Sequence, residues 1–153
     1  TTLFRSTFSV SRQQDCWQLT IGGLQGPRSN ISHEVIKRAT RACYGLFPKR
    51  LLMEFIWLMA ARCGIQHIYG VSDNGHVFRA LRYRLSKGRH FHASYDEFWQ
   101  SIEGVADSAW RWRLPLKLER KTLESIASKK RAEYRRRFQL LDDMAAQMTI
   151  IMD

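Results

Sequence analysis

Lysine and arginine are concentrated in the last third of the chain. The stretch from Arg111 to Arg137 holds eleven of them against three acids, a local balance of +8 within a total of +11. Such concentration favours phosphate-bearing partners: RNA, an anionic lipid surface or a phosphate-bearing donor. A solvated helix face whose long stems cover apolar surface is the alternative, because no base-reading motif accompanies the charge. The candidate polyanion-binding residues are Lys129, Lys130, Arg131, Arg135, Arg136 and Arg137.

A glycine-containing segment is the second place where chemistry could occur. Residues 22–28 read Gly-Gly-Leu-Gln-Gly-Pro-Arg, after a strand-like run and before a helical pattern. Glycines at such a junction let backbone N–H groups approach a phosphate, and the helix dipole favours the anion. The segment matches neither a P-loop nor a dinucleotide fingerprint, so a tight turn is the alternative interpretation. The candidate cofactor-binding residues are Gln25, Gly26 and Arg28.

Two residues are candidates for a catalytic role. His76 follows a turn after a predicted interior strand, a position where functional residues are common. Tyr95 opens the segment Tyr-Asp-Glu-Phe-Trp. In that segment Asp96 and Glu97 are adjacent and diverge on a helix, so aromatic packing with Asp96 as a helix cap is the alternative. The five histidines and three cysteines show no metal-ligand spacing, and no metal site is predicted.

The elements that would position these residues alternate between strands and helices. Two strand-like runs around a polar loop predict an antiparallel hairpin, which ends at the glycine segment. Helical spacing returns in the thirties, and Gly45, Pro48 and Gly64 suit a helix end, a helix start and a second helix end. After Pro115 the spacing predicts one helix that exceeds thirty residues. The remaining elements are a strand at 65–71, an undecided segment at 76–85, a helix at 95–102 and a strand at 110–114.

These elements indicate an α+β (mixed α/β) fold: a central, mostly antiparallel sheet with packed helices and a long basic C-terminal helix. A length of 153 residues fits a single domain. The first residue is not methionine, which suggests the C-terminal portion of a longer protein. Three separated cysteines and an apolar run too short to cross a bilayer favour a cytoplasmic protein, one that could bind peripherally at a membrane.

Several segments, taken in order, resemble the VirK/YbjX family of Gram-negative bacteria. The most specific are Tyr95–Trp99 and the Ser-Lys-Lys-Arg-Ala stretch from Ser128. The resemblance implies a virulence and envelope-stress factor that supports expression of outer-membrane virulence proteins and resistance to antimicrobial peptides. It implies no established active site. The other similar segments are 19–27, 45–52, 68–72 and 76–79.

The order of elements also resembles the acyl-CoA-binding half of GNAT-type acyltransferases. That resemblance implies an N-acyltransferase in which the loop with Gln25 and Gly26 would hold the pyrophosphate of an acyl-CoA. The spacing of later glycines departs from the acyltransferase pattern. The sequence therefore leaves three hypotheses: an envelope-stress factor, an acyltransferase, and an RNA- or anionic-lipid-binding module.

Overall fold

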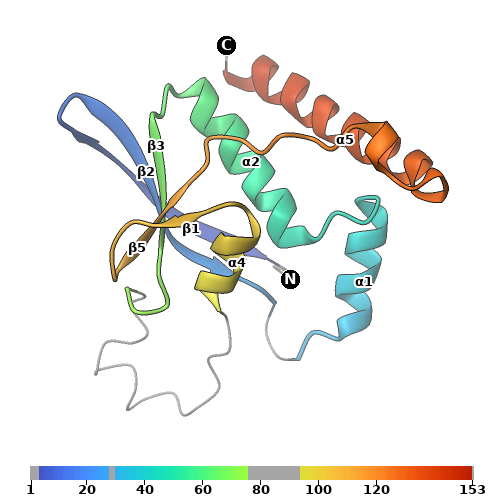
Figure 1. Cartoon of the computed structure of the whole chain (residues 1–153), viewed down its shortest axis with the longest axis horizontal. Helices are drawn as coiled ribbons and strands as arrows, with labels where there is room; N and C mark the ends of the chain where they lie inside the picture. The colour runs from blue at the N-terminus through green and yellow to red at the C-terminus, as the bar shows by residue number, and fades with distance from the viewer. Residues whose placement is uncertain (1–3, 28–29, 76–93, 153) are drawn as a thin grey trace. The chain divides into compact units, whose positions relative to one another are not determined.

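The computed structural model describes residues 4–27, 30–75 and 94–152 (Figure 1). Contacts within the chain divide it into two compact units, each built from separate stretches of sequence. Unit 1 contains residues 1–4, 26–63 and 119–153, and unit 2 contains residues 5–25 and 64–118. None of the described helices combines the length and hydropathy needed to cross a bilayer.

Unit 2 contains a five-stranded sheet. Its strands are β1 (Arg5–Gln13), β2 (Cys16–Gln25), β3 (His67–Val71), β4 (Val105–Ala106) and β5 (Arg111–Leu114). The strand order is β1-β2-β3-β5-β4, with β2 and β3 parallel and the other neighbours antiparallel. The prediction of a mostly antiparallel sheet with an interior third strand is confirmed.

The hairpin is longer than predicted. Gln14 and Asp15 make its two-residue turn with φ of 48° and 63°, the left-handed pair that matches the twist of the strands. Gly22 and Gly23 lie within β2, so the prediction that the glycines end the second strand is wrong. The register shifts opposite Thr7 and Phe8, and this bulge takes up one extra residue so that pairing continues to Gln25.

Helix α4 (Tyr95–Ser101) lies against the middle of the sheet and confirms the short helix predicted there. Trp99 is fully buried, and its Nε1 donates to the carbonyl of Val71 at 2.8 Å. Gly70 makes this approach possible, because a Cβ at that position would lie 2.5 Å from Cε2 of the indole. A side chain at residue 70 would therefore displace the helix from the sheet.

Unit 1 is helical: α1 (His33–Ala42), α2 (Pro48–Arg62), the short 3₁₀ turn η2 (Leu123–Ser125) and α5 (Ser128–Met152). Helix α2 packs on both α1 and α5. Pro48 is at the start of α2, and Gly45 and Gly64 adopt φ of 78° and 65° after α1 and α2. These predicted helix boundaries are confirmed.

The basic C-terminal helix is confirmed, but its predicted length is wrong. Helix α5 has 25 residues, because Ile126 is extended (φ −98°, ψ 134°) and separates it from η2. Ile126 is buried, and Nε of Arg131 donates to its carbonyl at 3.0 Å. The apolar periodicity predicted that the helix also includes Leu123. It could not reveal that the Ile126 carbonyl accepts from the side chain of Arg131.

Candidate functional site

The six candidate cations of α5 fall into two groups. Arg131 and Arg137 are partly covered and bond to backbone carbonyls, and Lys130 pairs with Glu133. The other three are exposed. We call Lys129, Arg135 and Arg136 the free cationic face.

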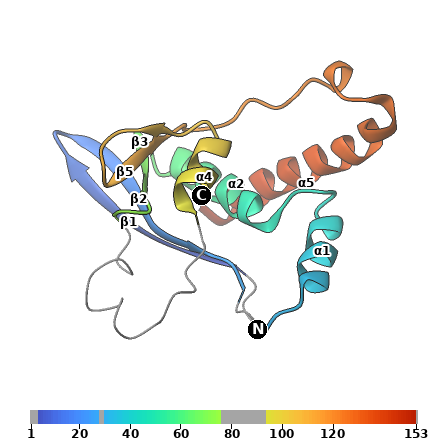
Figure 2. The same cartoon turned by 60° about the horizontal axis from the view of Figure 1, so that its bottom comes forward.

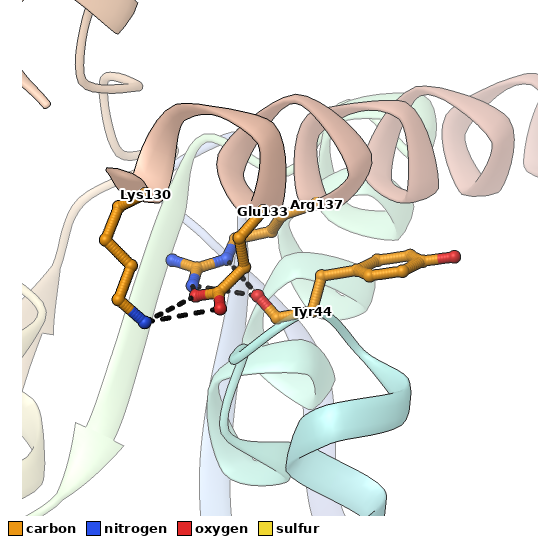
Figure 3. A network of polar contacts seen from close by, with 4 residues as sticks. All are labelled: Tyr44, Lys130, Glu133 and Arg137. Carbon is orange, nitrogen blue, oxygen red and sulfur yellow. Dashed lines mark hydrogen bonds and ion pairs between the residues drawn. The ribbon is translucent and has the colours of Figure 1, made fainter. Parts of the chain in front are cut away.

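Arg137 has a structural role at the corner between α1 and α2 (Figure 3). Its Nε and Nη2 donate to the carbonyl of Tyr44 at 3.0 and 2.9 Å, and Nη2 lies 3.4 Å from Oε1 of Glu133. The guanidinium also lies 4.0 Å from the ring centroid of Tyr134, and the side chain is 14% exposed. Tyr44 and Gly45 both have positive φ. Arg137 thus fixes a strained turn and is not available to a ligand.

Arg131 and Lys130 also have partners inside unit 1. Arg131 caps the extended residue before α5, as described above, and Lys130 lies 3.3 Å from Oε2 of Glu133. Upstream, Arg120 pairs with Asp142 at 2.8 Å and lies over the Phe138 ring at 5.3 Å. Much of the cationic segment therefore stabilises the fold of the unit.

The free cationic face has no hydrogen bond or ion pair with any residue that the structure describes. Lys129 and Arg136 are seven residues apart, so they lie on the same side of the helix about 10 Å apart along its axis. Arg135 points about 100° around the helix from Arg136, so the three cations cover a broad arc of its surface. The nearby acids are engaged elsewhere: Glu133 with Arg137, Asp142 with Arg120, and Asp143 with Gln139. This face is therefore positively charged and open to a polyanion.

The glycine segment offers fewer free amides than predicted. Gly22 and Gly23 belong to β2, and Oε1 of Gln25 accepts from Nε of Arg5 at 3.1 Å. Gly26 is exposed, and a Cβ there would lie 3.5 Å from the ring of Phe4. Arg28 lies outside the described residues. Gln25 and Gly26 are neighbours in the sequence, and the described residues do not form a phosphate-binding loop around them. Their role in cofactor binding stays a prediction.

Tyr95 is buried in unit 2, whereas His76 lies outside the described residues. The Tyr95 hydroxyl accepts from the amide of Leu24 at 3.3 Å. Burial raises the pKa of Tyr95, and the negative charge of Asp73 raises it further, against the opposite effect of the Leu24 amide. A phenol held neutral in the core is suited to packing and hydrogen bonding more than to proton transfer at neutral pH.

A polar cluster beside Tyr95 was missed by the sequence reasoning. Asp73 accepts from the amide of Tyr95 at 2.8 Å, while Asp96 accepts from the amide of Asp73 at 3.0 Å and from Nε1 of Trp112 at 2.8 Å. We call Asp73 and Asp96 the aspartate pair. Asp96 is therefore not the cap of α4; Ser94 is, accepting from the amide of Glu97. The spacing Ser-x-x-Glu from Ser94 was the signal for this cap.

The described residues contain no group of three or more His, Cys, Asp or Glu side chains placed to hold a metal ion.

Comparison with protein families finds one model, "Protein of unknown function (DUF535)", that matches residues 1–149. The chain is 48% identical over 142 residues to an Escherichia coli protein described as "Uncharacterized protein YbjX", covering 93% of the chain and 43% of that protein. It is 38% identical over 128 residues to an uncharacterized Haemophilus influenzae protein, covering 84% and 42%. A Mannheimia haemolytica protein described as "Membrane protein LapB" is 36% identical over 53 residues, 35% of the chain and 24% of that protein.

The chain spans less than half the length of these relatives. No solved structure matches the chain. The resemblance of the element order to GNAT-type acyltransferases is not confirmed.

Proposed function

The chain belongs to the DUF535 family, as its resemblance to VirK/YbjX proteins predicted, and from this premise we propose that it is an envelope-stress factor that docks on anionic membrane surfaces through α5. The supporting observation is the free cationic face. Three exposed cations without described partners remain after the other cations of the helix have bonded within the unit. Such charges lose little on binding anionic headgroups, because no internal bond has to break.

The composition of α5 favours a lipid surface over RNA. Proteins that bind single strands offer aromatic rings on which bases stack. The two rings of this helix, Tyr134 and Phe138, already lie under Arg137 and Arg120. Instead, α5 ends in apolar side chains, with Ile150 and Ile151 79% and 81% exposed. Cations combined with exposed apolar residues are typical of helices that lie on anionic membranes.

The charge at the start of α5 supports the same proposal. Lys129, Lys130 and Arg131 occupy the first turn, which contains no acid. The positive end of the helix dipole therefore faces three positive side chains, an unfavourable arrangement that nearby anions would offset. Contact with an anionic surface would then stabilise the first turn of the helix.

Vesicle binding tests the proposal. We expect the chain to bind vesicles of phosphatidylglycerol in phosphatidylcholine and not vesicles of phosphatidylcholine alone. Changing Lys129, Arg135 and Arg136 to Gln would remove about 3 kcal/mol of electrostatic attraction, or roughly 100-fold in affinity. Binding should also weaken with salt.

The matched control removes three exposed cations from α1, in the triple change Lys37→Gln, Arg38→Gln and Arg41→Gln. It should weaken vesicle binding far less than the α5 change. Equal losses in the two variants would mean that net charge alone acts, and would contradict a defined face. Binding to mixed RNA without binding to anionic vesicles would contradict the lipid proposal.

Acyl-CoA is an alternative phosphate-bearing ligand, as the acyltransferase hypothesis requires. Calorimetry with acetyl-CoA and a longer acyl-CoA separates the two. A bound donor would stabilise the chain against heat. Saturable binding of acyl-CoA that survives the α5 change would contradict membrane docking as the function and would support an acyl-CoA site.

The envelope role itself is tested in a Gram-negative host. Deleting the gene of the whole protein should increase sensitivity to cationic antimicrobial peptides. The normal gene should restore resistance, and the gene with the α5 change should not. Unchanged sensitivity after deletion would contradict the envelope role, whereas full rescue by the variant would separate that role from the free cationic face.

A further inference from the structure

Among the strands that the structure describes, β1 is an edge of the sheet in unit 2. Of the described strands, β2 alone pairs with it, and eight of its nine residues are exposed. Figure 2 shows the two long strands of the hairpin running side by side. An edge strand of this length presents a row of N–H and C=O groups to which another strand can bond.

The hairpin turn determines which groups of β1 point outward. In a two-residue hairpin the residues flanking the turn form a hydrogen-bonded pair, here Gln13 with Cys16. Hydrogen-bonded and non-bonded pairs then alternate along the ladder. Phe8, Val10 and Arg12 fall at non-bonded positions, so their backbone groups point away from β2 and are available to another strand.

The same residues have exposed side chains. Phe8 is 41% exposed and Val10 48%, although each is paired across the ladder with a residue that is fully buried, Ile21 and Leu19 respectively. The apolar face of the sheet thus extends to the edge strand, where its side chains become exposed. The strand contains no proline, and the residues between Arg5 and Arg12 carry no charge. It therefore lacks the features that commonly protect an edge strand against pairing.

We propose that β1 is a dimerisation edge that pairs antiparallel with β1 of a second copy, with the twofold axis at Ser9. This register is compatible with the outward groups, because Phe8 is then opposite Val10 of the partner in a hydrogen-bonded pair. Both apolar side chains lie on one face, where aromatic and β-branched residues pair favourably across strands.

The charges of the strand suit this register. Arg12 is opposite Ser6 and Arg5 is opposite Gln13, so no two arginines face each other. A shift by one residue would place Arg5 opposite Arg12 and would also turn the outward backbone groups out of register. The occupant of the edge is therefore a second copy of the chain, because β1 is complementary to itself in sequence and in hydrogen bonding.

Sedimentation velocity over a range of protein concentrations tests the dimer. The wild-type chain should associate reversibly, and Val10→Pro should sediment as a monomer. Proline at residue 10 removes an N–H that points outward, which an edge strand tolerates, so the fold should remain intact by circular dichroism. A wild-type chain that stays monomeric up to millimolar concentration would overturn the proposal.

Charge exchange at the twofold axis tests the register. Ser9→Lys and Ser9→Asp each place two like charges directly opposite each other and should weaken the dimer roughly fivefold. An equal mixture of the two variants should recover association, because lysine then faces aspartate. Ser11→Lys is the matched control, since residue 11 faces Thr7 of the partner, and it should leave the dimer unchanged. Failure of the mixture to recover association would overturn the register.

Discussion

The aspartate pair in unit 2 and the free cationic face in unit 1 use charge in opposite ways. Each carboxylate of the pair accepts hydrogen bonds from fixed donors, so Asp73 holds the start of α4 and Asp96 holds the turn after β3. The cations of the face have no described partner. Saturated polar groups stabilise a fold, whereas unsaturated ones remain available for binding.

The same contrast occurs within α5. Arg136 and Arg137 are neighbours in the sequence, yet Arg137 is 14% exposed and bonded to Tyr44, whereas Arg136 is exposed. A count of charges cannot distinguish them. Variants in which stability and vesicle binding are measured separately test the different roles of these two arginines.

The largest expected effect on stability is in unit 2. Trp99→Ala removes a fully buried indole and its bond to Val71, and should lower the free energy of unfolding by about 3–5 kcal/mol. Urea denaturation measures this loss. Trp110→Ala is the control, because this side chain is 64% exposed and its removal should change stability by less than about 0.5 kcal/mol. Similar losses in the two variants would contradict the packing described for α4.

The aspartate pair should show the next largest effect. Asp96→Ala leaves the amide of Asp73 and Nε1 of Trp112 without their acceptor, at a cost of about 2–3 kcal/mol. Asp96→Asn retains an acceptor oxygen and should cost less than half as much. If the alanine and asparagine variants unfold at the same urea concentration, the carboxylate is not the acceptor that holds the turn.

The two neighbouring arginines of α5 give the sharpest test of the comparison. Arg137→Gln should lower stability by about 2 kcal/mol, because the Tyr44 carbonyl loses a charged donor. Arg136→Gln should change stability by less than about 0.5 kcal/mol. Vesicle binding, measured on the folded variants, should show the reverse order. A stability loss at Arg136 equal to that at Arg137 would abolish the distinction.

A smaller effect is expected at alkaline pH. Burial raises the pKa of Tyr95 above its ordinary value of 10.0, so the fold favours the neutral phenol. The stability that this preference contributes is complete below pH 10 and is lost as pH rises through the folded-state pKa. Tyr95→Phe should therefore reduce the decline in stability as pH rises above 10.0, as followed by urea denaturation. An unchanged alkaline decline would show that other groups cause it.

Local signals in the sequence predicted most of the elements. Gly45, Pro48 and Gly64 marked helix boundaries because their backbone preferences act without tertiary contacts. The errors arose where distant residues decide. The bulge at Gly22 depends on pairing with β1, and the end of η2 depends on a bond from Arg131.

The candidate site was predictable only as a group. The sequence predicted that six cations bind a polyanion together, and all six lie on α5. Their division depends on partners such as the Tyr44 carbonyl, which lies 93 residues away in the chain. The assignment of the chain to a single domain stays a prediction.

The interleaving of the two units has a consequence for synthesis on the ribosome. When residue 63 has been made, unit 1 still lacks α5, and unit 2 has its hairpin but not β3 or β5. The Tyr44 carbonyl at the corner after α1 can accept from Arg137 only after a further 93 residues have been translated. Closing such long loops is slow, so unit 1 stays incomplete until α5 has been made.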